Sequence, residues 1–156
     1  MKNRIRVGVF LFKDDKVLLI KHVNPQTGQT WWVPPGGGIQ GAESIFDAAV
    51  REAKEEANLT IKPGPVRYAR QFIYTEFDQN NADFYILGEI IDGQEHIENL
   101  RGMGGDEHFI KELKYFSQEE IAGITVFPSI LRDIVWEDKR RGFPETRFLG
   151  VQGEGD

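Results

Sequence analysis

The chain has 156 residues, with 19 Lys and Arg, 25 Asp and Glu, three His and no Cys. Without Cys, the chain has no disulfide scaffold, no thiolate nucleophile and no Cys-ligated metal centre. The net charge of −6 argues against bulk nucleic-acid binding, and no apolar stretch approaches the roughly 18 residues of a membrane helix, so we expect a cytoplasmic protein without a membrane segment.

The N-terminal part of the sequence alternates between strand and turn signals. Two apolar, β-branched runs, Ile5 to Phe12 and Val17 to His22, are separated by the charged residues Lys13 to Lys16, which predicts a hairpin. A short strand is expected at Trp31 to Val33, and it ends at the turn-forming run Pro34 to Gly38.

One helix follows these strands. From Ser44 to Ala57 the sequence pattern is that of an amphipathic helix. Ser44 and Asp47 have the spacing of an N-terminal capping box, and Asn58 tolerates the left-handed conformation that often ends a helix. Both ends of this helix are therefore predicted.

The second half of the chain contains longer strands and two further helices. Pro63 to Pro65 predicts a break. The elements expected after it are strands at Val66 to Phe77, Phe84 to Ile91 and His108 to Phe116, a short helix opened by the capping box Ser117 to Glu120, and a last helix at Ser129 to Asp138.

No internal repeat or linker divides the sequence, so we expect a single domain over residues 1–156. The order of elements predicts the α+β class, with a mixed and largely antiparallel sheet. The core of the domain is expected at about residues 4–138, followed by a C-terminal extension, residues 139–156, that has no clear pattern.

Three carboxylates are the most informative group in the sequence. On a helix that turns by about 100° per residue, Glu52, Glu55 and Glu56 share one face. Like charges three or four residues apart repel each other by a few tenths of a kcal/mol per pair, so this face requires a compensating cation. Arg51 is one such cation, and a divalent metal is a better one.

The residue types also favour particular metals. Oxygen ligands without His or Cys suit Mg²⁺ or Mn²⁺. Gly36 to Gly38 let the backbone come close enough for a carbonyl to join the ligands. The alternative interpretation is that the three glutamates form an ordinary solvated helix face.

The spacing of these residues favours the metal interpretation, because the segment from Gly37 to Leu59 resembles the Nudix box, G-x5-E-x7-R-E-U-x-E-E-x-G-U, where U is bulky and aliphatic. Asn58 replaces the final Gly and Ala53 is smaller than the usual aliphatic residue, but neither position is a metal ligand. The positions that match the box are Gly37, Glu43, Arg51, Glu52, Glu55, Glu56 and Leu59.

The resemblance implies an α/β/α sandwich around the mixed sheet and a hydrolase that uses Mg²⁺ or Mn²⁺. Nudix hydrolases cleave a nucleoside diphosphate linked to another group. The implied metal ligands are Glu55, Glu56 and the carbonyl of Gly36, with Glu52 as a further ligand or as the base that orients the attacking water. Arg51 is implied to hold the glutamates in place, and Glu43 to support Arg51.

The family often adds a carboxylate from a later loop or strand. Glu107, which follows two glycines, and Glu112, in the expected strand before Tyr115, are the two candidates. Other residues are open to two interpretations, base stacking or core packing for the aromatics and phosphate contact or a wet sheet face for the arginines. They are Trp31, Trp32, Phe72, Tyr74 and Phe77, and Arg4, Arg6, Arg67 and Arg70.

The expected substrate is a small-molecule nucleotide: a nucleotide sugar, an ADP-ribose-like compound, a dinucleoside polyphosphate or a nucleoside triphosphate. One alternative is a Nudix-fold module that senses a nucleotide without cleaving it, and another is an unrelated α+β domain with an accidental match. Homodimerisation is expected by resemblance only.

Overall fold

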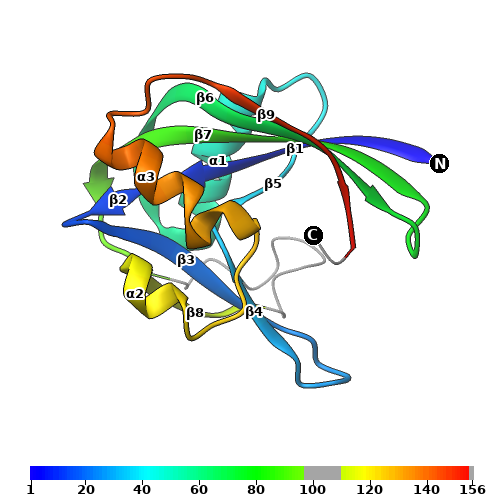
Figure 1. The fold of residues 1–156 in the computed structure, drawn as a ribbon, viewed down its shortest axis with the longest axis horizontal. Coiled ribbons are helices and arrows are strands. Elements are labelled where there is room, and N and C mark those ends of the chain that lie inside the picture. The colour runs from blue at the N-terminus through cyan, green and yellow to red at the C-terminus, as the bar shows by residue number, and fades with distance from the viewer. Residues whose placement is uncertain (97–109, 155–156) are drawn as a thin grey trace.

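The computed structural model describes residues 1–96 and 110–154 (Figure 1). The strands are β1 Lys2–Phe10, β2 Phe12–Lys13, β3 Lys16–Val23, β4 Thr30–Val33, β5 Gly36–Gly38, β6 Leu59–Tyr74, β7 Gln79–Gly93, β8 Ile110–Phe116 and β9 Arg147–Gly153. The helices are α1 Ile45–Ala57, α2 Gln118–Ile121, the 3₁₀-helix η3 Ser129–Arg132 and α3 Ile134–Arg140.

The strands form two sheets. Sheet A has the order β5-β1-β7-β6-β9, and sheet B contains β2, β3, β4 and β8, with β3 paired to the other three. Within the described residues, β1 runs parallel to β7 and β9 runs parallel to β6, while the other strand pairs are antiparallel. The predicted α+β fold with a mixed, largely antiparallel sheet is therefore confirmed.

Strand β1 separates two hydrophobic layers because successive side chains of a strand point to opposite faces. Val7 and Val9 pack with the helix α1 residues Ala49 and Ala53 in one cluster, whereas Phe10 packs on the other face with residues of α3. Figure 1 shows α1 and α3 on the two sides of sheet A. The α/β/α layering implied by the family resemblance is thus present.

The predicted hairpin between the first two strands is only partly correct. Asp14 and Asp15 have φ angles of 51° and 61°, as a tight two-residue hairpin turn requires. However, only the short strand β2 pairs with β3 through this turn. The longer strand β1 instead pairs with β5 and β7, which lets it bury both of its faces in the core.

The break predicted at Pro63 to Pro65 is wrong. Strand β6 continues through these residues and remains paired with β7, with a register shift between Pro63 and Val66. A bulge tolerates proline because the irregular residue does not need its backbone N–H for the ladder. A Cβ atom on Gly64 would lie 2.6 Å from the carbonyl oxygen of Leu87, so the bulge also requires glycine there.

Helix α1 has the ends that the sequence predicts. The Ser44 side chain accepts a hydrogen bond from the Asp47 backbone N–H and the Asp47 side chain accepts one from the Ser44 N–H, both at 3.0 Å. Asn58 caps the C-terminus in the left-handed region, with φ of 58° and ψ of 32°. Both signals act within four residues, so the local sequence is enough to predict them.

The last predicted helix is divided in two. The backbone of Asp133 leaves the helical region, with φ of −144° and ψ of −68°, and its side chain accepts from the Ile134 N–H to start α3. Residues 139–156, for which the sequence predicts no element, contribute the end of α3 and the edge strand β9. Within the described residues, no helix has the length and apolarity needed to span a bilayer.

Candidate active site

The candidate site lies where helix α1 passes the glycine strand β5. Glu52 and Glu56 are one turn apart on α1, and both face β5. A Cβ atom on Gly37 would lie 2.5 Å from Glu52 Oε1, so a glycine at this position lets the carboxylate come close to the backbone. The glycine run therefore sets the distance between the helix and the strand.

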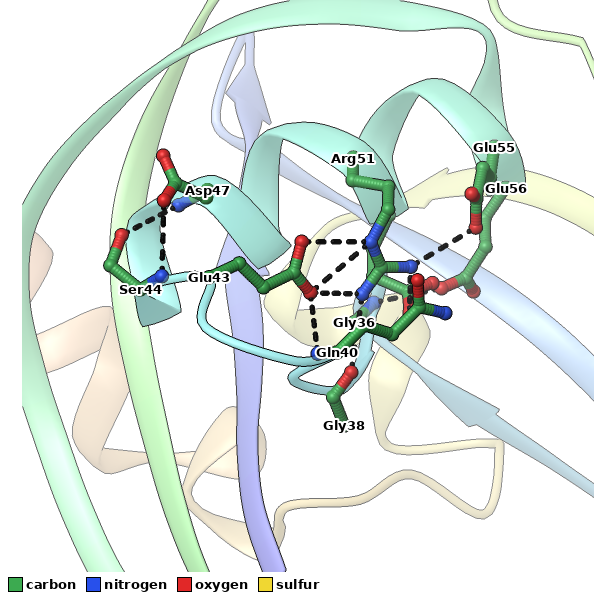
Figure 2. Close-up of polar contacts among 10 residues, drawn as sticks. Gly36, Gly38, Gln40, Glu43, Ser44, Asp47, Arg51, Glu55 and Glu56 are labelled. Atoms are coloured by element: carbon green, nitrogen blue, oxygen red, sulfur yellow. Dashed lines mark hydrogen bonds and ion pairs between the residues drawn. The ribbon is translucent and has the colours of Figure 1, made fainter.

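Arg51 connects the residues of the site to one another. Figure 2 shows its guanidinium pointing back to the loop that precedes α1, where Nη2 lies 2.6 Å from Glu43 Oε1 and 3.2 Å from the Gly38 carbonyl oxygen. Its Nη1 donates to Glu52 Oε1 at 3.0 Å and to Glu55 Oε2 at 3.2 Å. One planar cation thus holds three carboxylates and one backbone carbonyl.

Glu43 ties the loop to this arginine. Its Oε1 also accepts a hydrogen bond from the Gln40 backbone N–H at 2.8 Å. The hydrogen bond from Arg51 holds the pKa of the Glu43 carboxyl below its usual range. Glu43 is therefore an ionised carboxylate that joins the loop to Arg51, the residue that the family resemblance implies it supports.

Glu56 is the most buried of the four glutamates at the site. Its side chain is 8% exposed and accepts one hydrogen bond, from the Gly36 backbone N–H at 3.1 Å. Burial raises the pKa of Glu56 well above its usual range, and the neighbouring Glu52 raises it further. A positive charge placed here would offset both effects.

The donor set fits a hard divalent cation. The available ligands are carboxylate oxygens and the backbone of a glycine strand, which Mg²⁺ and Mn²⁺ prefer. In residues 1–96 and 110–154, side chains of Asp, Glu and His do not already converge in threes as at a metal site. Instead, Arg51 Nη1 donates to both Glu52 and Glu55, so these two carboxylates already share one positive group.

Two arginines of strand β1 lie next to the glycine strand β5, where Arg6 pairs in register with Gly38. The positive charge of Arg6 acts to lower the pKa of Glu56. A Cβ atom on Gly38 would lie 2.7 Å from Arg4 Nε, so the Arg4 side chain passes over the glycine strand. The structure therefore brings positive side chains from another strand to the edge of the site.

The sequence predicts two candidates, Glu107 and Glu112, for a further carboxylate ligand. Glu107 lies outside the described residues. Glu112 is exposed on β8, opposite Lys21, and lines a hollow of about 470 Å³ together with Trp32 and Lys114. It does not bond with the residues around Arg51 in the described structure.

The aromatic candidates divide between core and surface. Trp32 and Phe72 are 7% exposed, which favours the core interpretation for both. Phe77 is 63% exposed, and Tyr74 lies between Phe72 and Phe77 with ring centroids 4.5 Å and 5.9 Å away.

Sequence reasoning missed Asn81 and Asp83, which are 1% and 6% exposed on the face of sheet A opposite α1. The available signal was the alternation of Asn81 and Asp83 with the apolar residues Ala82 and Phe84 in β7.

The fold and this arrangement define a class of protein, an α+β domain in which one helix holds a glutamate cluster against a glycine strand. The model of the NUDIX domain matches residues 2–135, so the chain belongs to the NUDIX family. This result confirms the family that the sequence analysis identifies by resemblance.

Individual relatives match parts of the chain. The uncharacterized Nudix hydrolase YvcI of Bacillus subtilis is 33% identical over 92 residues, which cover 57% of this chain and 56% of YvcI. The 8-oxo-dGDP phosphatase NUDT18 of Mus musculus is 39% identical over 57 residues, 36% of this chain and 17% of NUDT18. The chain thus matches about half the length of YvcI and a smaller share of NUDT18.

The fold has close counterparts among solved structures. The crystal structure of a NUDIX hydrolase from Nitrosomonas europaea has a TM-score of 0.70 and 22% sequence identity. The comparison covers 99% of this chain and 81% of that protein. At this identity the likeness concerns the fold.

Proposed function

We propose that this chain is a divalent-metal-dependent hydrolase that cleaves the pyrophosphate linkage of a nucleoside diphosphate joined to another group. The observation that carries the proposal is the cluster of Glu52, Glu55 and Glu56 against the glycine strand, held by Arg51. Membership of the NUDIX family supports it, as does the name of the relative NUDT18, which acts on a nucleoside diphosphate.

The charges of the site explain why a cation is needed. A diphosphate is strongly anionic, and bare carboxylates would repel it. A bound divalent cation supplies the charge that attracts the diphosphate and lowers the pKa of water at the site. Glu55, Glu56 and the carbonyl of Gly36 are the proposed ligands. Glu56 accepts a hydrogen bond from the Gly36 N–H of β5, and Arg51 holds Glu55 beside Glu52.

Each remaining residue has a proposed role that follows from its contacts. Glu52 is a further ligand or the base that accepts a proton from the attacking water. Arg51 orients Glu52 and Glu55 and offsets the repulsion between their charges, since one of its nitrogens donates to both carboxylates. Glu43 holds Arg51 in that position, and Arg6 offers a positive charge to the phosphates from strand β1.

The experiment that tests this function is a cleavage screen with Mg²⁺ and with Mn²⁺, in which chromatography separates each nucleotide from its products, because hydrolysis between two phosphates leaves phosphate esters or pyrophosphate. It covers nucleoside triphosphates, ADP-ribose, nucleotide sugars and dinucleoside polyphosphates. The test variant is Glu56→Gln, and the matched control is Glu137→Gln, which changes an exposed glutamate of α3 on the other side of sheet A. We expect metal-dependent cleavage of at least one class, lost in Glu56→Gln and kept in the control.

A second measurement separates catalysis from sensing. Calorimetric titration with Mn²⁺ and with each nucleotide class reports binding independently of turnover. Binding of both metal and nucleotide without cleavage of any class would replace the hydrolase with a nucleotide-sensing module of the same fold. Absence of metal binding would remove the proposed metal centre altogether.

A further inference from the structure

Strand β9 forms the outer edge of sheet A. It is the last strand in the order β5-β1-β7-β6-β9 and runs parallel to β6, beside which Figure 1 shows it. No other strand pairs with β9 in residues 1–96 and 110–154. An edge strand presents a row of backbone N–H and C=O groups to which a further strand can add. The fold thus offers a place where sheet A can be extended.

Two exposed apolar side chains lie on one face of β9. Phe148 is 71% exposed and Val151 is 64% exposed. Phe148 pairs in register with Ala69 and Val151 with Gln71, so the residues between Phe148 and Val151 form a bulge in the ladder. Gly150, with a φ of 83°, permits this bulge. Because of the bulge, Phe148 and Val151 point to the same side of sheet A.

Helix α1 leaves this end of the sheet face open. One row across β1, β7, β6 and β9 consists of Val7, Phe84, Ala69 and Phe148. Val7 packs in the same cluster as α1 and is 3% exposed. Phe84 and Ala69 are half-buried, and Phe148 is exposed. The cover that α1 provides therefore decreases toward β9.

The sequence of β9 does little to prevent pairing with another strand. Natural edge strands often carry Lys or Pro, which oppose edge-to-edge association. Strand β9 contains neither, and its charged residue, Arg147, is bonded to Asp138 of α3 through Nε and Nη2 at 2.8 Å each. The stretch from Phe148 to Gly153 has no charge. The bulge at Gly150 is the feature of β9 that opposes pairing.

The start of β9 is positively charged. Arg67 of β6 is next to Tyr68, which pairs in register with Arg147. Arg141 caps the C-terminus of α3, the helix to which Arg147 is bonded. Arg147 forms ion pairs with two carboxylates, whereas Arg67 and Arg141 form none with a described residue. The charges of Arg67 and Arg141 are therefore not neutralised locally.

The end of β9 is negatively charged. Glu154 directly follows the strand and accepts a hydrogen bond from Thr75 Oγ1 at 3.2 Å. Glu76, next to Thr75, is exposed in the turn after β6. Neither glutamate forms an ion pair within the part of the chain that the structure describes. When two such strands run antiparallel, the negative end of each lies beside the positive end of the other.

We propose that β9 is the interface between two copies of this chain, whose β9 strands pair antiparallel about a twofold axis near Gly150. The axis is perpendicular to sheet A, so the sheets of the two copies become continuous. Phe148 and Val151 of one copy then pack beside the same residues of the other. The charges at the strand ends favour the antiparallel direction, because a parallel pair brings like charges together. The association involves none of the glutamates on α1 and does not depend on catalysis.

The test measures the mass of the chain in solution by sedimentation equilibrium over a range of protein concentrations. Phe148→Lys and Val151→Lys each place a charge on the exposed face of β9, which a monomer tolerates. The matched control is Ile91→Lys, which changes a 62% exposed residue where β7 pairs with the start of β6, away from β9. Circular dichroism verifies that each variant is folded.

We expect the wild-type chain to form a dimer whose dissociation constant rises at least about tenfold in Phe148→Lys and in Val151→Lys. Ile91→Lys should dimerise like the wild-type chain. A monomer at every concentration would overturn the proposal and show that the bulge at Gly150 is enough to protect this edge. A dimer that neither β9 variant weakens would place the interface elsewhere and overturn it too.

The direction of pairing has a test of its own. Glu154→Lys should weaken the dimer, since it brings like charges together at both ends of the antiparallel pair. Glu89→Lys is the control, because it makes the same charge change at an exposed position of β7 that pairs with Lys62. A dimer that Glu154→Lys leaves unchanged would overturn the antiparallel arrangement.

Hydrogen exchange of the wild-type chain gives a readout that needs no variant. The backbone amides of β9 should exchange more slowly as the protein concentration rises, because pairing with the second copy protects them. The amides of β4, at the edge of sheet B, should not respond. Exchange of the β9 amides that is independent of concentration, in a chain that dimerises, would exclude β9 as the interface.

Discussion

Arg51 Nη2 lies 2.6 Å from Glu43 Oε1, although the two residues are eight positions apart in the chain. Their side chains are 19% and 17% exposed, so the ion pair is partly shielded from water. The pair fastens the loop between β5 and α1 to the helix that carries the glutamates. The geometry of the glutamate cluster therefore depends on a residue outside that helix.

Replacing Arg51 with Lys should lower activity more than stability. A lysine ammonium cannot donate at once to Glu43, Glu52, Glu55 and the Gly38 carbonyl, because it lacks the planar fork of the guanidinium. We expect kcat to fall at least about tenfold. A double-mutant cycle with Glu43→Gln should give a coupling energy of about 1 kcal/mol in chemical denaturation. Additive effects of the two changes would show that Glu43 does not act through Arg51.

Replacing Glu56 with Gln should remove the stabilisation that a metal provides. With Mg²⁺ at about 100 times its dissociation constant, one site adds about 2.7 kcal/mol to the free energy of unfolding. We expect the melting temperature of the wild-type chain to rise with Mg²⁺ and to fall back with EDTA, and that of Glu56→Gln to respond to neither. Glu137→Gln serves as the control, and an undiminished Mg²⁺ response in Glu56→Gln would exclude Glu56 as a ligand.

Asp138 makes the stability of the fold depend on pH. Its carboxylate is 2% exposed and accepts from Tyr68 Oη at 2.6 Å and from Arg147 Nε and Nη2 at 2.8 Å each. The hydrogen bonds from Arg147, and then that from Tyr68, hold the pKa of Asp138 below its ordinary 3.8 in the folded chain. A pKa lowered by folding contributes stability above the unfolded value, and that contribution is lost as the pH falls through the folded value.

We therefore expect Asp138→Asn to lower the melting temperature by at least about 4 °C at neutral pH. The difference from the wild-type chain should shrink as the pH drops below about 4. Thermal unfolding followed by circular dichroism between these limits measures it. Asp14→Asn is the control, since Asp14 is exposed in a turn, and a difference that is independent of pH would contradict the electrostatic explanation.

Asn58 should tolerate glycine but not a β-branched residue. Its φ of 58° is easy for glycine, and its Nδ2 donates to the Gln94 carbonyl oxygen at 3.1 Å. We expect Asn58→Gly to change the free energy of unfolding by less than about 1 kcal/mol, and Asn58→Val to lower it by about 2 kcal/mol. Urea denaturation of both variants measures this. Equal effects would mean that the left-handed conformation is not what Asn58 contributes.

Several features of the candidate site could be predicted from the sequence alone. The capping box of α1, the left-handed Asn58 and the shared face of the three glutamates depend on residues at most four positions apart, so the helical period suffices to predict them. These features were predicted correctly because local backbone geometry determines them.

The pairing of the strands, in contrast, could not be predicted from the local sequence. The parallel pairing of β1 with β7, the continuation of β6 through Pro63 to Pro65 and the edge strand β9 all depend on partners that are distant in sequence. A local pattern of apolar residues shows that a strand can form, but it does not show which strand lies beside it.

The sequence by itself therefore determined the family, the helix and the carboxylates that it carries. Only the tertiary structure decided that Arg6, Asp83 and Arg70 lie side by side across three strands, with Asn81 next to them on the same face. The physical reason is that burial and the register of three strands bring these polar groups together, and both arise only when the sheet is complete.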